Sequence, residues 1–209
     1  GKPGFSFPRP ERFLSISEQQ DTLQALRPEK VFVMGGEPTV AKELDEMLKY
    51  AKNILGAETR LGHTNGSRLP LECLDAANVG FKAWSEDLHL ELTGRPKALI
   101  YDNFANAFDA GIKMGANMVF VPGLVGLDEM EGLLKFLAGL DREIPFHIMG
   151  YIPVPGLSYS RPTDEEMDAA LALAKSYLTN VASSHLTTEE ALDLSARDDR
   201  FKVKVVAGV

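Results

Sequence analysis

Short apolar runs alternate with amphipathic helical patterns along nearly the whole chain, and this alternation constrains the fold more than any other feature. Residues 31–34 and 118–121 are each four apolar residues, followed by Gly35-Gly36 and by Pro122-Gly123. Such bounded runs are typical of buried strands. Apolar residues between them recur every three or four positions, as in residues 127–140. Strands that alternate with helices form parallel βαβ units, so we expect an α/β fold.

The pattern predicts where the elements lie. The strands are expected at residues 31–34, 58–61, 79–84, 118–121 and 145–149, with a half-exposed terminal strand around Phe201, Val203 and Val205. Four helices are expected at residues 40–55, 71–77, 99–114 and 127–140. Three more are expected to begin at capping pairs, which are Ser17 with Gln20, Thr163 with Glu166 and Thr187 with Glu190. This gives five strand–helix repeats, preceded by a helix whose strand is absent. No linker or repeat divides residues 1–209, which predicts one domain.

Composition excludes several classes of function. The chain has 209 residues, and its net charge of −8 argues against a broad nucleic-acid surface. No run approaches the roughly 20 apolar residues that span a membrane, and no signal peptide opens the chain. Cys73 is the only cysteine, so no internal disulfide forms and a cytoplasmic location is expected. The start at Gly1 suggests an interior piece of a longer protein or a tag remnant.

Polar and glycine residues follow the first two predicted strands. Ligands of parallel α/β folds bind at the carboxyl ends of the strands. Gly35 and Gly36 allow backbone to approach a ligand, and Pro38 leaves nearby carbonyls free to accept from an ammonium group. Thr64 and Asn65 offer hydroxyl and amide groups suited to a carboxylate or a ribose. Both segments could instead be ordinary turns, with Glu37 serving the start of a helix.

Lys82 is the charged residue of the third strand. A lysine on an interior strand is costly to bury without an anionic partner, so we expect Lys82 to bind a carboxylate. A strand-end lysine that reaches solvent is the alternative. Ser85 follows this strand, Val121 ends the fourth and Tyr151 follows the fifth.

Other polar residues are assigned structural roles. The four histidines, at 63, 89, 147 and 185, lack metal-ligand spacing and are expected to be structural or exposed. Cys73 is expected to be a buried hydrophobe. The acidic groups at Asp128, Glu129 and Glu131 are expected to favour the dipole of their helix.

The order of these pieces resembles the radical S-adenosylmethionine (SAM) family, in particular the activating enzymes of the pyruvate formate-lyase-activating type. The resemblance runs from about Phe13 to Pro155. Gly35-Gly36-Glu37-Pro38 is similar to the family's GGEP motif. The other segments that carry the resemblance are Thr64-Asn65-Gly66, Lys82, Leu92-Thr93-Gly94 and Val121-Pro122-Gly123. The cofactor-binding residues implied by the resemblance and by the strand ends are Gly35, Gly36, Glu37, Pro38, Thr64, Asn65, Lys82, Ser85, Val121 and Tyr151.

The resemblance implies a partial parallel (β/α)6 TIM-like barrel without its first βα unit. It also implies SAM and a [4Fe–4S] cluster as cofactors, an electron donor, and hydrogen abstraction from a protein or small-molecule substrate. The family's C-x3-C-x2-C segment is missing and is expected upstream of Gly1, so this chain alone should be inactive. Gly80 stands where the family has an aspartate, and no histidine lies near Tyr151-Ile152.

Two other functions remain open from the sequence. A cluster-free barrel could bind SAM or a partner protein without catalysis. A TIM-barrel lyase could use Lys82 as a Schiff-base lysine, although eight βα units are not found. No catalytic residue is assigned.

Overall fold

A computed structural model describes residues 12–197 and 206–207. The strands are β1 (Lys30–Val33), β2 (Glu58–Thr64), β3 (Ala76–Phe81), β4 (Lys113–Phe120), β5 (Phe146–Gly150) and β6 (Val181–Ser184). The helices are α1 (Ile16–Leu26), α2 (Leu44–Asn53), α3 (Glu86–Thr93), α4 (Ala98–Asp109), α5 (Leu127–Leu140), α6 (Asp164–Tyr177) and α7 (Thr188–Arg197), with short 3-10 turns at Pro38–Val40 and Leu71–Cys73.

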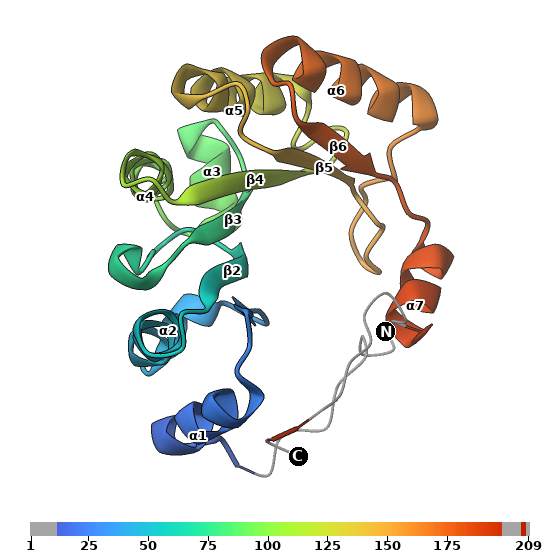
Figure 1. The fold of residues 1–209 in the computed structure, drawn as a ribbon. Coiled ribbons are helices and arrows are strands. Elements are labelled where there is room, and N and C mark those ends of the chain that lie inside the picture. Colours follow the sequence, from blue (N-terminus) through green and yellow to red (C-terminus); the bar gives the residue numbers. More distant parts are fainter. Residues whose placement is uncertain (1–11, 198–205, 208–209) are drawn as a thin grey trace.

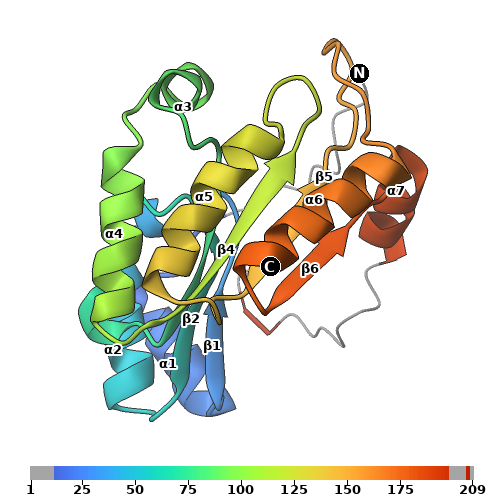
Figure 2. The same cartoon turned by 90° about the horizontal axis from the view of Figure 1, so that it is seen from above.

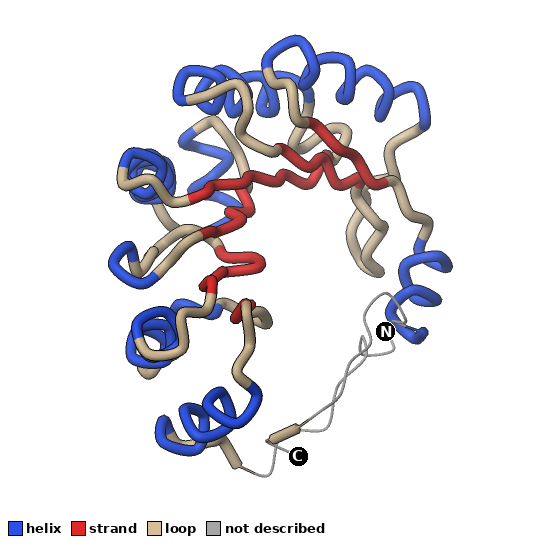
Figure 3. Tube along the Cα trace, in the orientation of Figure 1, coloured by secondary structure: helices blue, strands red, loops and turns tan. Residues whose placement is uncertain are grey.

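The six strands form one sheet in sequence order, and every neighbouring pair is parallel. The sheet curves into an open arc, with α2, α4, α5 and α6 on its convex side (Figure 1, Figure 3). Figure 2 shows the strands side by side and running in one direction. Among the described strands β1 and β6 are the two edges, so the arc is a partial barrel. The predicted fold class is confirmed, and the closed eight-stranded barrel of a TIM-barrel lyase is not observed in this region.

The hydrophobic core lies between the convex face of the sheet and the helices. Phe81 of β3 and Met118 of β4 are buried against Phe104 of α4 and Leu133 of α5. Burying each such side chain contributes roughly 1.5–3 kcal/mol relative to leaving it in water. The buried residues Met118 and Phe120 of the second apolar run therefore face the helices, whereas Phe32 and Met34 of the first run are exposed.

The concave face of the sheet has a different composition. Closed barrels fill this space with branched apolar side chains. Here Gly62, Asn78, Gly115 and His147 line an open cavity of about 1190 Å³. Small and polar residues thus leave room on the side of the sheet that faces away from the helices.

The first helix begins two residues earlier than predicted. Ser15 caps α1, because its hydroxyl accepts a hydrogen bond from the Glu18 amide while the Glu18 carboxylate accepts from the Ser15 amide at 2.8 Å. The predicted Ser17–Gln20 box is therefore wrong. Both pairs fit the capping-box pattern, but Glu18 brings an ionised acceptor to the helix start. The predicted caps at Thr163 with Glu166 and at Thr187 with Glu190 are confirmed.

Two predicted helices had wrong bounds. The helix predicted at 71–77 is only the 3-10 turn Leu71–Cys73, because the Asp75 carboxylate accepts from the Thr59 amide at 2.8 Å and the chain enters β3. The helix predicted at 99–114 ends at Asp109, since Gly111 adopts a left-handed conformation with φ of +82°. The helix α3 and the strand β6 were not predicted from the sequence, and the predicted strand around Phe201 lies outside the described residues. No helix in the described part of the chain is both long and apolar enough to cross a bilayer.

Candidate functional site

Glu37 joins the carboxyl ends of β1 and β2. One carboxylate oxygen accepts from the Thr64 hydroxyl at 2.7 Å and from the Thr39 hydroxyl at 2.6 Å. The other oxygen accepts from the Asn65 amide at 2.6 Å. The two loops that the sequence singled out are therefore held together by one side chain.

The surroundings of Glu37 keep this carboxylate ionised. Partial burial alone would raise its pKa, but the hydrogen bonds from Thr39, Asn65 and Thr64 outweigh burial and lower the pKa below the usual value. A charged acceptor of this kind binds its donors more strongly than a neutral one. The pairing between the loops is therefore strongest at neutral pH.

Gly35 and Gly36 leave the backbone after β1 open. Their φ angles of +100° and +49° lie in the left-handed region that favours glycine. A Cβ on either residue would have no atom within 4 Å. Exposed backbone in this conformation can contact a ligand directly, as the sequence predicted.

The side chains of Thr64 and Asn65 are partly engaged in local structure. The Thr64 hydroxyl donates to Glu37 and accepts from the Gly66 amide at 3.2 Å. The Asn65 side-chain oxygen accepts from the Ser67 amide at 2.8 Å. Thr64 therefore acts by positioning the loop, and the Asn65 side-chain NH2 is the group left to donate to a ligand.

Lys82 lies on the concave side of the sheet. A Cβ placed on Gly80 would be 3.8 Å from the Lys82 Nζ and 3.9 Å from the Thr64 carbonyl oxygen. Lys82 therefore does not point into the helix layer, and the structure records no salt bridge for it among residues 12–197. The ammonium group is placed beside the loops that Glu37 joins.

Glu129 holds the backbone that follows Lys82. Its carboxylate is 8% exposed and accepts from the amides of Trp84 and Ser85 at 2.5 and 2.8 Å. Lys97 donates to the Trp84 carbonyl and lies over the indole ring at 3.9 Å from its centroid. The role assigned to Glu129 from the sequence, favouring a helix dipole, was therefore incomplete, because the sequence contains no local signal for a partner 44 residues away.

Tyr151 follows β5, as predicted, and Val121 lies one residue beyond β4 instead of ending it. Both residues join the site less closely. Val121 is buried and pairs with Val125. The Tyr151 hydroxyl accepts from the Val154 amide at 3.1 Å. In the described region no hydrogen bond connects either residue to the group formed by Glu37, Thr64 and Asn65. Binding of a cofactor by Val121, Tyr151 and Ser85 stays a prediction.

The described residues do not fit an iron–sulfur cluster. A [4Fe–4S] cluster is held by several cysteine thiolates. Cys73 is the chain's one cysteine, and burial raises the pKa of its thiol. No group of three or more His, Cys, Asp or Glu side chains is placed to hold a metal ion within residues 12–197.

One relative is similar in sequence to most of this chain. The chain is 31% identical over 168 residues to a Methanocaldococcus jannaschii protein named provisionally as a glycyl-radical enzyme activating enzyme. The match covers 75% of this chain and 63% of that protein, so this chain spans less than two thirds of its relative.

Solved structures show the same architecture. A domain of the pyruvate-formate lyase-activating enzyme from Bacteroides vulgatus has a TM-score of 0.60 at 18% identity, covering 74% of this chain and 98% of that chain. SuiB from Streptococcus suis, solved bound to S-adenosylmethionine, has a TM-score of 0.65 at 19% identity, covering 83% of this chain and 44% of that chain.

A family model identifies the superfamily directly. The model of the radical SAM superfamily matches residues 3–137, a span that includes both loops joined by Glu37. This family implies SAM and a [4Fe–4S] cluster. With a match over more than half of its length, the chain belongs to the radical SAM superfamily.

Proposed function

We propose that this chain is the SAM-binding and substrate-facing part of a radical SAM enzyme of the activating type. The observation that carries the proposal is the arrangement at Glu37, which holds the exposed glycine backbone after β1 beside the Thr64-Asn65 loop after β2. A relative named provisionally as an activating enzyme supports the choice of reaction class.

The residues of the site fit the methionyl end of SAM. Carbonyl groups near Gly35 and Gly36 would accept from its ammonium group. Lys82 would pair with its carboxylate, helped by the side-chain NH2 of Asn65. Two opposite charges recognised at separate points would fix the direction of the ligand.

The cluster requires ligands beyond the 209 residues. When bound, a [4Fe–4S] cluster would supply the electron for reductive cleavage of SAM and so the radical chemistry of hydrogen abstraction from the substrate. Since Cys73 is single and buried, we place the cluster cysteines upstream of Gly1 in a longer protein. A protein substrate, an external electron donor and a cytoplasmic location complete the proposal.

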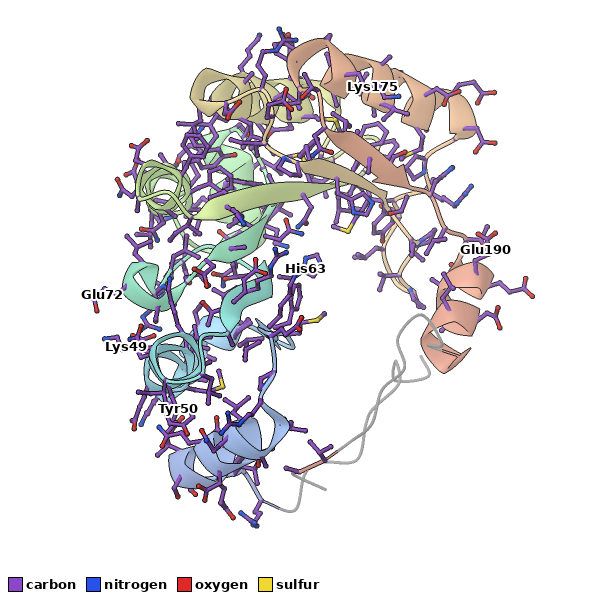
Figure 4. The ribbon with its side chains drawn as sticks, in the orientation of Figure 1. Lys49, Tyr50, His63, Glu72, Lys175 and Glu190 are labelled. Atoms are coloured by element: carbon purple, nitrogen blue, oxygen red, sulfur yellow. The ribbon has the colours of Figure 1, made fainter. Side chains whose placement is uncertain are left out.

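Binding of SAM by the rim is tested with Lys82→Met. Equilibrium dialysis of the 209-residue chain should show weak SAM binding that falls by about tenfold in this variant, because a charge-assisted contact contributes roughly 1.5–3 kcal/mol. Lys175→Met is the matched control, since Lys175 is exposed on α6, on the convex side of the sheet (Figure 4). Equal loss in both variants, or no SAM binding at all, would count against the rim.

Activity is tested with a longer protein. The 209-residue chain should form no 5′-deoxyadenosine with dithionite. A protein extended upstream through a C-x3-C-x2-C segment should become brown on anaerobic reconstitution with iron and sulfide, and then release 5′-deoxyadenosine. If the longer protein lacks such cysteines, or forms a cluster without producing deoxyadenosine, the radical-enzyme proposal is wrong. The single buried cysteine would then favour a cluster-free module that binds SAM or a partner.

A further inference from the structure

A row of polar side chains crosses the concave face of the sheet near the loops that Glu37 joins. This lumen row consists of His63, Asn78, Asn117 and His147. The Cα of Asn117 pairs in register with that of His147 on the next strand. The Asn117 side-chain nitrogen contacts Asn78 Oδ1 at 3.2 Å and His63 Nδ1 at 3.4 Å. Figure 4 shows His63 on the concave side of the sheet.

The lumen row faces open space. His63, Asn78 and His147 line the cavity of about 1190 Å³. Gly62 and Gly115 line the same cavity and add no side chain that would fill it. Asn117 is only 3% exposed, and a carboxamide is costly to bury unless it is hydrogen-bonded. A polar row of this kind on the wall of a cavity is better suited to holding a ligand than to core packing.

The direction of the hydrogen bonds shows what the lumen row can bind. Asn117 Nδ2 is the donor to both neighbours, so Asn78 Oδ1 and His63 Nδ1 are the acceptors. A neutral His63 that accepts at Nδ1 carries its proton on Nε2. The groups that His63 and Asn78 leave for a ligand, the Nε2–H and the side-chain NH2, are both donors, while Asn117 Oδ1 faces Gly80. The row therefore favours a ligand with acceptor oxygens.

The cavity lining contains two basic and two acidic side chains, and the acidic ones do not come from the strands. Strands β3, β4, β5 and β6 contain no Asp or Glu. The guanidinium of Arg60 is already paired with Glu58 on its own strand, at 2.9 Å. Lys82 adds a positive charge where β3 ends, near Thr64. The titratable side chains that line the cavity are Arg60, His63, Lys113, Asp141, Glu143 and His147.

The acidic members of this set lie at the far end of the cavity. Asp141 and Glu143 precede β5, and Lys113 begins β4, so these three residues are near the amino ends of the strands. His63 and Asn117 lie farther along their strands toward the rim, whereas His147 is the second residue of β5 and lies nearer to this end. An anion at the row would therefore meet donors and imidazole rings.

From this arrangement we propose that the lumen row binds a carboxylate group of the hydrogen-donating substrate. The identification of the ligand as a substrate rests on the proposed function, since Met34 and His63, which line the cavity, directly precede the Gly35 and Thr64 loops assigned to SAM. His63 and Asn78 donate to the carboxylate oxygens, Asn117 positions both of them, and His147 adds positive charge when it is protonated. None of these four residues belongs to the glycine-rich rim.

Binding should depend on pH in a defined direction. Burial, and secondarily the charge of His63, lower the pKa of His147, so its ring is neutral at pH 7. A bound carboxylate stabilises the charged imidazolium and raises this pKa. Carboxylate binding therefore takes up a proton, and the affinity increases as the pH falls.

The test uses acetate and its neutral isostere acetamide as probes on the 209-residue chain. Both are titrated while the imidazole signals of His63 and His147 are followed by NMR. Acetate should shift both signals, raise the pKa of His147 and bind up to about tenfold more weakly for each pH unit above that pKa. Acetamide should leave the signals in place. An equal response to acetamide, or acetate binding that does not change with pH, would overturn the proposal.

Substitutions locate the site. His63 is exposed, so His63→Leu should fold normally and weaken acetate binding at least about tenfold, the loss of one charge-assisted contact of roughly 1.5 kcal/mol. Asn117→Asp should abolish acetate binding, because it places a negative charge at the row. Asn117→Gln keeps a neutral amide at the same position and serves as the comparison. Lys135→Met removes an exposed positive charge from α5 and should leave binding unchanged. If His63→Leu and Lys135→Met behave alike, the row is not the site.

The outcome is separable from that of the proposed function, because the acetate titration requires neither SAM nor a cluster. Acetate binding without deoxyadenosine formation in the longer protein would retain the carboxylate site and reject the radical reaction. Deoxyadenosine formation without acetate binding would reject the lumen row alone.

Discussion

Glu37 determines whether the two rim loops act as one unit, and its replacement by glutamine tests this. In Glu37→Gln an amide NH2 must face at least one of the present donors, Asn65, Thr64 or Thr39. The free energy of unfolding should fall by roughly 1–3 kcal/mol in urea denaturation at pH 7. Glu43→Gln is the control, because Glu43 precedes α2 and makes no capping hydrogen bond. Its effect should stay within about 0.5 kcal/mol.

The same carboxylate makes a prediction about pH. Hydrogen bonds lower the folded-state pKa of Glu37 below that of the unfolded chain, which is about 4.3. The stabilisation is therefore complete above that value and is lost as the pH falls through the folded-state pKa. Urea denaturation should show the difference between wild type and Glu37→Gln shrinking below about pH 4.3. A difference that grows on acidification would show that Glu37 is not bound as an anion.

Single residues were predictable from the sequence only where a local motif contains them. Gly35, Gly36 and Glu37 form such a motif, and their exposure after β1 follows from it. Glu129 was not predictable, because its partner Ser85 is 44 residues away. The link between His63 and Asn117 spans 54 residues, and an isolated histidine carries no spacing signal.

Among the helices, α5 offers a matched pair of glycines. A Cβ on Gly132 would lie 2.2 Å from atoms of the Trp84 ring, whereas a Cβ on Gly139 would meet nothing within 4 Å. Gly132→Ala must displace the indole and should lower the free energy of unfolding by roughly 1–3 kcal/mol. Gly139→Ala should be neutral or stabilise by up to about 1 kcal/mol.

Tryptophan fluorescence distinguishes the two variants, because Trp84 is the only tryptophan. The emission should change in Gly132→Ala and not in Gly139→Ala. Unchanged emission and unchanged stability in Gly132→Ala would show that α5 does not pack on Trp84 as described.

Elements were predicted where their apolar residues are periodic and missed where they are short. The helix α5 matches its predicted bounds, since its stripe of leucines persists over the whole element. The strand β6 has only four residues, Val181–Ser184, two of them serines, and so gives no apolar run. The strand β6 forms because it pairs with β5, and its own sequence gives no signal of this pairing.

At the scale of the whole molecule, the alternation of elements predicted the parallel sheet but not how far the sheet closes. Closure depends on how many strands are present, and the alternation only fixes the type of each unit. The described strands end at β1, where Phe32 is 53% exposed and Met34, the residue after the strand, is 62% exposed. The neighbouring α1 has no buried residues. This side of the arc therefore presents both backbone and apolar side chains.

An open parallel edge of this kind should associate. Unpaired backbone groups on an edge strand can pair with a second copy, and exposed apolar side chains favour the contact. We expect sedimentation velocity to show an average mass that rises with the concentration of the 209-residue chain.

The double variant Phe32→Lys/Met34→Lys should remain monomeric, since charged side chains disfavour pairing at an edge. Leu26→Lys is the control, because Leu26 is 52% exposed at the end of α1 and outside the strand. A longer protein that supplies the preceding strand should also be monomeric, because that strand would occupy the edge of β1. Association that is lost in Leu26→Lys but kept in the double variant would place the contact on α1 and contradict pairing through β1.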